Sequence, residues 1–394
     1  MKERLQYINN KIQENSELLL ILLLLVFYFT EALTKFLEVA GFQKVEVQAG
    51  FKALVFGFVL IALALFKKRG LFYILILTVV FCIGQISVFD GFSKSATIYF
   101  FKYVFSIGLL FYFSANSSKP KFKLFKVFEY LLVFTSVLVI LGGVFEIPFF
   151  KSYGGSRYGY NGLAASTATS TYFYLIGFCY FLWRYKKDLL KNWKFWFIAL
   201  SSLIIGTKSI VLALAALGLI YILQFLDNRK YKWSLLTVAT LMILAAGYYI
   251  LFINATFVAI TKTQGVLTSF LSLRDQLLLE QTLPYIQENW GILNYLFGGV
   301  SNFEIRPQME LFDMVLFWGF CGTALYLYFF YKSFVQFPIQ GVLQKFLLLL
   351  ILFIVFLAGN FFYNASVVIY LIILRESFVL NSVISSQGVN KYSS

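Results

Sequence analysis

Long apolar stretches recur along the whole of this chain and limit its fold more than any other sequence feature. Hydrophobic residues make up 60% of the 394 residues and charged residues only 13%, whereas a soluble domain carries about a quarter charged residues. A chain of this composition cannot cover itself with a water-compatible surface. Apolar runs of about 17 residues or more are typical of helices that cross a bilayer. The sequence therefore predicts an all-α integral membrane protein.

We interpret each long apolar run as one transmembrane helix, which gives about twelve spans. Two of them, 195–206 and 346–359, are short for a hydrocarbon core of about 30 Å. No hydrophilic stretch is long enough for a separate soluble domain, so residues 1–394 are expected to form a single polytopic membrane domain. The predicted spans are 18–38, 50–66, 71–88, 97–114, 128–149, 163–183, 195–206, 209–226, 234–254, 313–331, 346–359 and 362–380.

The positive charges indicate how these spans are oriented. The net charge is +15, and most Lys and Arg residues fall in dense clusters between alternate spans. Cytoplasmic loops show this pattern, and it argues against a protein that binds nucleic acid. Twelve spans would place the N-terminus and the C-terminus together in the cytoplasm. The basic loops on that side would be 67–69, 119–126, 184–194, 229–232 and 332–345.

Two segments on the opposite, outer side are longer than a turn. They are the loop 150–162 and the larger segment 256–311. In the larger segment, Ser272 and Asp275 have the spacing of a helix-capping box, and leucines follow on one helical face as far as Pro284. We therefore expect a short amphipathic helix there, lying on the membrane surface or over a cavity.

The absence of histidine restricts the chemistry of this chain. It excludes a histidine-containing metal site, a Ser-His or Cys-His nucleophile and a histidine general base. We expect no metal and no cofactor. Any proton transfer must therefore use Asp, Glu, Lys or Tyr.

Arg157 lies in an outer loop that is rich in glycine and tyrosine. Glycines let backbone amides approach a ligand closely, and a guanidinium pairs with phosphate through two hydrogen bonds. The tyrosines, Tyr158 among them, could stack on sugar rings. An arginine that reaches to lipid headgroups and an interfacial aromatic belt explain the same pattern.

Lys208 follows a very short connection, Gly206-Thr207, between two predicted spans. A lysine at this place could contact a phosphate from the start of a helix. It could equally extend its ammonium group to the membrane surface.

Further charges gather in and after the larger outer segment, at Arg274, Arg306, Glu310 and Asp313. Glu310 and Asp313 are three residues apart, so both carboxylates lie on one face at the start of a span. The helix dipole alone favours acidic residues there. Alternatively, Glu310, or Asp313 in second place, is a general base beside arginines that bind an anionic substrate.

Charges also lie within the predicted spans. Glu31 and Lys35 can pair at helical spacing, as can Lys35 and Glu38. Lys102 lies inside the fourth span. Intramembrane charges of this kind form either a satisfied structural network or a transport path.

In their order, spacing and sidedness, the outer residues resemble the O-antigen and capsule polysaccharide polymerases, the Wzy family. The likeness covers about the second half of the chain. Relatives tend to carry Glu-x-Asp-x-x-Asp before a span with Gly-x-x-Gly, and here Gln308 departs from that pattern. The matching stretches are Arg157 to Leu163, Gly206-Thr207-Lys208, Arg274 with Asn294 to Gly299, and Gln308 to Asp313 with Trp318 to Gly322.

The resemblance implies a membrane-embedded glycosyltransferase at the outer face of the bacterial inner membrane. It would transfer a growing glycan from undecaprenyl pyrophosphate to a hydroxyl of the next lipid-linked repeat unit. Membrane lipid, a chain-length regulator and a flippase would be its partners. The resemblance assigns substrate and pyrophosphate binding to Arg157, Arg274, Lys208, Arg306, Tyr158 and Asn161, and catalysis to Glu310 and Asp313.

Three other interpretations remain open. A flippase for lipid-linked oligosaccharides would need its essential charges within the spans. An O-antigen ligase uses outer-loop histidine in addition to arginine, and this chain has none. In a non-catalytic scaffold, no single outer charge would matter.

Overall fold

The computed structural model describes residues 14–42, 47–114, 121–153, 157–252, 255–335, 339 and 341–386. These residues form helices and connections, and their only β pairing is one isolated bridge between Lys151 and Tyr160. Seven of the described helices are long and apolar enough to cross a membrane, which agrees with the predicted all-α membrane class. They are α2 (Ser16–Val39), α3 (Val47–Phe66), α4 (Lys68–Ile86), α5 (Lys94–Ser114), α6 (Phe122–Phe145), α9 (Lys208–Phe225) and α16 (Glu310–Phe330).

Every predicted span overlaps one helix, and five of these helices are not among the seven. As the sequence indicated, α8 has only 11 residues and α17 only 17. The five helices are α7 (Thr167–Tyr185), α8 (Trp193–Leu203), α10 (Arg229–Phe252), α17 (Val342–Ala358) and α18 (Ala365–Ser386).

The helix α7 lies at the centre of the bundle. All of its residues from Thr169 to Trp183 are buried. It packs against α18 over most of its length. At one end, Asn364 Nδ2 donates a hydrogen bond to Thr169 Oγ1, and at the other, Trp183 Nε1 donates one to the carbonyl of Ser377. A helix enclosed by protein has no lipid-facing surface, so its Thr and Tyr residues do not oppose burial as long as they are hydrogen-bonded.

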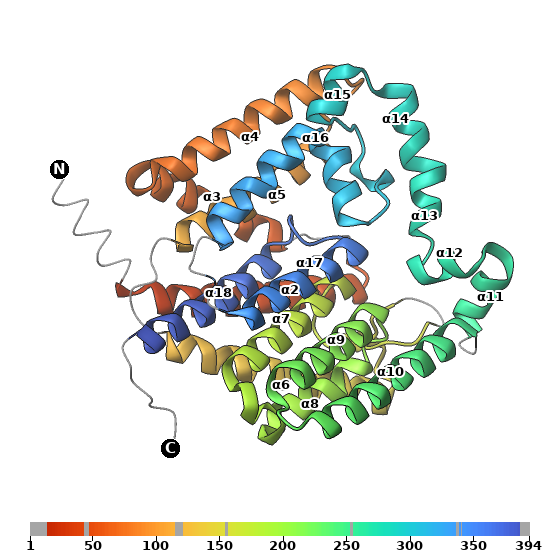
Figure 1. Cartoon of the computed structure of the whole chain (residues 1–394). Coiled ribbons are helices and arrows are strands. Elements are labelled where there is room, and N and C mark those ends of the chain that lie inside the picture. The colour runs from red at the N-terminus through yellow and green to blue at the C-terminus, as the bar shows by residue number, and fades with distance from the viewer. Residues whose placement is uncertain are drawn as a thin grey trace.

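The helices are arranged around this centre in three groups (Figure 1). The central group is α2, α7, α17 and α18, with α3, α4, α5 and α16 on one side and α6, α8, α9 and α10 on the other. The remaining helices run around one end of the bundle, from α10 to α16. They are α11 (Ala255–Gln264), α12 (Val266–Leu271), α13 (Arg274–Leu277), α14 (Leu283–Asn289) and α15 (Ile292–Phe297).

The segments predicted to share the outer side meet at this end of the bundle. In the loop 157–162, the backbone N–H of Tyr160 donates a hydrogen bond of 3.0 Å to the carbonyl of Ile204 in the α8–α9 connection. Lys208 at the start of α9 donates to the carbonyl of Ser269. Arg274 donates to the carbonyl of Leu357 at the end of α17. The alternation of loops inferred from charge is therefore consistent with the fold.

The predicted capping box at Ser272 is wrong. Ser272 ends α12 with a φ of 57°, Leu273 follows with a φ of 67°, and no side chain caps α13. Asp275 instead accepts a hydrogen bond from Thr268 Oγ1 at 2.5 Å. A π-helical turn at Leu278–Thr282 then leads into α14. The helical run then continues without a break from Arg274 to Asn289, so a helix is present where the sequence predicted one, and it begins after two left-handed residues.

A buried ion pair joins the opposite end of the bundle. Lys121 Nζ lies 2.6 Å from Glu376 Oε2, and both side chains are almost completely buried. The pair links the start of α6 to α18, so residues more than 250 positions apart in sequence are fixed together. Removing one member of such a pair leaves an uncompensated charge in the interior.

We expect Glu376→Gln to lower the free energy of unfolding by about 3 kcal/mol, because Lys121 loses its carboxylate. The matched control is Asp227→Asn, which breaks the Lys187–Asp227 pair at side-chain exposures of 66% and 86%. That change should cost less than about 0.5 kcal/mol. Denaturant unfolding of both variants in detergent micelles measures the difference, and equal losses would contradict it.

Candidate functional site

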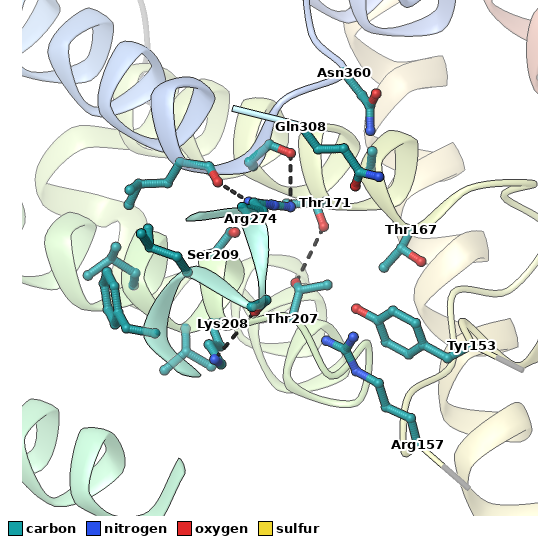
Figure 2. Close-up of a pocket in the computed structure, with 18 of the residues that line it drawn as sticks. Tyr153, Arg157, Thr167, Thr171, Thr207, Lys208, Ser209, Arg274, Gln308 and Asn360 are labelled. Atoms are coloured by element: carbon teal, nitrogen blue, oxygen red, sulfur yellow. Dashed lines mark hydrogen bonds between the residues drawn. The ribbon is translucent and has the colours of Figure 1, made fainter. Parts of the chain in front are cut away.

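A cavity of about 550 Å³ lies where the segments predicted to share the outer side meet (Figure 2). Three cations line it, namely Arg157, Lys208 and Arg274. No carboxylate belongs to the described residues that form its wall. Like charges that face one cavity without a counter-charge create a positive potential there. The cavity is therefore suited to an anionic ligand.

The guanidinium of Arg157 is positioned by an aromatic ring. Its central carbon lies 3.7 Å from the centre of the Tyr153 ring, a cation–π contact. Arg157 makes no hydrogen bond to any residue that the structure describes, so its in-plane N–H donors remain available. Burial raises the pKa of the Tyr153 hydroxyl, which therefore stays protonated at neutral pH and can donate a hydrogen bond.

Two glycines bring the Arg157 loop next to Lys208. A Cβ on Gly206, which has a φ of 76°, would lie 2.5 Å from the carbonyl oxygen of Tyr158. A Cβ on Gly159 would lie 2.4 Å from the carbonyl oxygen of Ile205. Only glycine at both positions lets the two backbones touch. The glycines seen in the sequence thus serve loop-to-loop packing, which places two of the cations on one cavity.

Lys208 is held between α9 and the crossing segment. Its ammonium donates to the carbonyl of Ser269 and to Ser272 Oγ, the latter at 3.4 Å. It also lies 3.5 Å from the centre of the Phe257 ring. These contacts fix the ammonium beside the cavity without neutralising its charge.

Arg274 binds the end of α17. Its guanidinium donates to the carbonyls of Leu357 and Ala358, the latter at 3.2 Å. A cation at a helix C-terminus satisfies terminal carbonyls and is favoured by the helix dipole. Burial lowers the pKa of Arg274, because desolvation disfavours its charge. An anion in the cavity would offset that penalty, so Arg274 can hold α17 and a ligand together.

Arg306, the fourth predicted cation, lies behind the cavity wall. Its Nη2 donates to Asn360 Oδ1 at 3.1 Å, and Asn360 lines the cavity. Its Nε lies 3.8 Å from Asp313 Oδ2. Arg306 therefore reaches the cavity through Asn360 and not directly.

The two predicted catalytic carboxylates are fully buried and do not line the cavity. Glu310 accepts hydrogen bonds from the backbone N–H groups of Phe361 and Phe362 at 2.9 and 3.0 Å. Neither oxygen of Asp313 accepts a hydrogen bond from the described residues. Glu310 thus braces the turn between α17 and α18, and this turn carries Asn360.

Tyr158 and Asn161 also lie outside the cavity wall. The side chain of Tyr158 is 60% exposed. Asn161 is buried and accepts a hydrogen bond from Lys35 Nζ at 2.5 Å. Of the predicted binding residues, the structure therefore brings only Arg157, Lys208 and Arg274 to the cavity.

Glu31 and Lys35 of α2 form hydrogen bonds with other residues and do not pair with each other. Lys35 also donates to the carbonyl of Gly162 at 2.7 Å. Glu31 accepts from Ser366 Oγ at 3.1 Å and from the backbone N–H of Ala165 at 3.3 Å. These contacts tie α2 to the start of α7 and to α18. They favour the structural network over the transport path.

The uncharged cavity residues were not predicted from the sequence. The hydroxyl-rich start of α7, Ser166 to Thr171, was the one signal that could have indicated them, because polar residues open an otherwise apolar helix there. One wall is apolar and comes from α9, α10 and α12. The uncharged polar residues are Tyr153, Ser166, Thr167, Thr171, Thr207, Ser209, Ser272, Gln308 and Asn360.

Comparison of the chain with protein-family models, curated proteins and solved structures found no match.

We expect Gly206→Ala to weaken binding of inorganic pyrophosphate at least about tenfold, because the added Cβ separates the Arg157 loop from Lys208. The control is Gly218→Ala within α9, where an added Cβ meets nothing within 4 Å. Calorimetric titration of both variants in lipid nanodiscs measures the effect. Unchanged binding by the Gly206 variant would show that this packing does not position the cations.

Proposed function

We propose that this protein is a membrane-embedded glycosyltransferase of the Wzy type, which extends a polysaccharide from undecaprenyl-pyrophosphate-linked repeat units. The observation that carries the proposal is the convergence of Arg157, Lys208 and Arg274 on one cavity, whose described wall contains no carboxylate. The same three residues carry the sequence resemblance.

A lipid pyrophosphate matches both walls of the cavity. Its phosphates would lie against the three cations. Its prenyl chain would follow the apolar wall, which reaches along α9 from Lys208 to Ala215. Seven residues of helix cover about 10 Å, so this wall extends well below the charged groups. Gly247 of α10 completes the wall and leaves open space where a side chain would be.

The chemistry that follows is glycosyl transfer without a metal. The bond between the anomeric carbon and the pyrophosphate oxygen breaks, and a bond from that carbon to the acceptor hydroxyl oxygen forms. Negative charge develops on the departing pyrophosphate, and cations placed in advance stabilise it. Arg157 supplies unused N–H donors, and Tyr153 supplies a hydroxyl donor.

The acceptor hydroxyl must also lose its proton. In the conformation described, Glu310 braces the α17–α18 turn and acts as a positioning residue. No carboxylate belongs to the described part of the wall. The departing pyrophosphate is then the group in the cavity that accepts the proton from the acceptor hydroxyl. A base role for Glu310 or Asp313 would require the turn that carries Asn360 to move.

The proposal includes the membrane topology. All twelve helices that overlap the predicted spans would cross the bacterial inner membrane, with both termini in the cytoplasm and the cavity on the outer side. Lipid-linked units would reach the cavity after transfer by a flippase, and a chain-length regulator would act beside the polymerase.

We expect Arg157→Ala, Lys208→Ala and Arg274→Ala each to weaken binding of farnesyl pyrophosphate about 10- to 100-fold. Each change removes a charge-assisted contact that contributes roughly 1.5–3 kcal/mol. Lys262→Ala is the control, because Lys262 is an exposed cation of α11 that does not line the cavity. Titration of the purified protein in lipid nanodiscs measures all four variants.

The same variants test polymerisation in cells. Arg157→Ala and Arg274→Ala should leave single repeat units on the cell surface, whereas Lys262→Ala should give polymer of normal length. Lipid-linked units trapped on the cytoplasmic side would indicate a flippase instead. Normal polymer from either arginine variant would contradict the role proposed for that residue.

A further inference from the structure

The cavity has a second polar region, and this region carries no charge. Gln308 and Asn360 line it and lie above the three cations in Figure 2. Gln308 precedes α16, and Asn360 follows α17. Gly359, the residue before Asn360, packs against the backbone of Gln308, because a Cβ on Gly359 would lie 2.4 Å from the carbonyl oxygen of Gln308. We call these two residues the amide pair.

The amide of Asn360 has a fixed orientation. Its Oδ1 accepts a hydrogen bond from Arg306 Nη2 at 3.1 Å and another from the hydroxyl of Tyr363. A guanidinium can only donate, so the atom that faces Arg306 must be the oxygen. The Nδ2 group is then left to donate into the cavity. Arg306 and Tyr363 thus present a neutral donor to whatever occupies this region.

Gln308 offers both a donor and an acceptor. Its side chain lines the cavity and makes no hydrogen bond to any residue that the structure describes. Gln308 and Asn360 also share an unusual backbone, with φ values of 59° and 61°. A non-glycine residue in this region costs about 1 kcal/mol, and such strain is concentrated at sites that contact ligands.

We propose that the amide pair is a sugar subsite, which recognises the monosaccharide bonded directly to the pyrophosphate. This inference rests on the proposed function. The anomeric carbon is bonded to a phosphate oxygen, so the first sugar must lie next to the phosphates. The amide pair adjoins the cationic wall and supplies neutral donors and an acceptor, which suit hydroxyl and acetamido groups. Thr167 and Thr171 add hydroxyls on the same side of the cavity.

Gln308→Met separates this role from phosphate binding, and Asn360→Asp, which also adds a negative charge, tests the donor that faces the cavity through the ratio of affinities. Gln308→Met removes the amide without changing the charge or the length of the side chain. Asn360→Asp keeps an oxygen for Arg306 and Tyr363 and replaces the donor that faces the cavity by an acceptor. The control is Asn161→Asp, the same exchange at a buried amide that binds Lys35 and lies outside the cavity.

The probes are farnesyl pyrophosphate and its conjugates with glucose, galactose and N-acetylglucosamine, titrated into the full chain in lipid nanodiscs. We expect the unmodified protein to bind at least one conjugate more tightly than farnesyl pyrophosphate. Gln308→Met should reduce that preference at least about tenfold and leave the affinity for farnesyl pyrophosphate within about twofold. Asn360→Asp should reduce the same ratio, and Asn161→Asp should preserve it. Retained binding of farnesyl pyrophosphate shows that the variant cavity is folded.

Three results would overturn the inference. The unmodified protein could bind farnesyl pyrophosphate and show no preference for any conjugate. Gln308→Met could preserve the preference in full, or it could weaken all four probes equally, as a phosphate contact would. If the unmodified protein bound none of the four probes, the proposed function itself would fail, and the inference with it.

Discussion

Mutual repulsion among three cations is the constraint on which the cavity end of this protein depends. Arg157, Lys208 and Arg274 face one cavity, and none of the described residues that line it is a carboxylate. Each must therefore be held by contacts that leave its charge intact. An aromatic ring holds Arg157, a carbonyl and a second ring hold Lys208, and the end of α17 holds Arg274. Rings and carbonyls position a cation without cancelling its field.

The same requirement explains how the surrounding connections are built. The Arg157 loop touches the α8–α9 connection through two glycines. The segment from α12 to α13 passes through two consecutive left-handed residues before Arg274. The α17–α18 turn is held by Glu310 from behind. In each case, irregular backbone is stabilised by specific contacts, and a cavity residue lies directly beside it. Such strain persists only where neighbouring structure fixes it.

The sequence predicted the class of fold, and three of the residues it singled out meet at one cavity. Apolar run length reports helices because lipid-facing surface must be apolar. The few charged residues in the segments predicted to lie outside were informative, because placing a charged side chain near a membrane costs free energy and usually reflects a function. The capping box at Ser272 failed because residue spacing does not report backbone handedness. The sequence also could not show which residues Glu310 contacts. Its spacing from Asp313 indicates that the two carboxylates share a helix face, but it does not indicate that this face packs against the α17–α18 turn. Gln308 and Asn360 come together only through tertiary contact.

The enclosure of α7 has a consequence for how such a protein can change over time. A helix that touches lipid must keep an apolar surface, which leaves little freedom in its composition. Because α7 is surrounded by protein, the hydroxyl groups of its first turn face the cavity and are not exposed to lipid. They therefore do not add to the free-energy cost of placing the helix in the membrane. The innermost helix is thus the one whose polar residues are free to vary with the ligand. The peripheral helices are constrained by the bilayer, and the central helix is constrained by what the cavity binds.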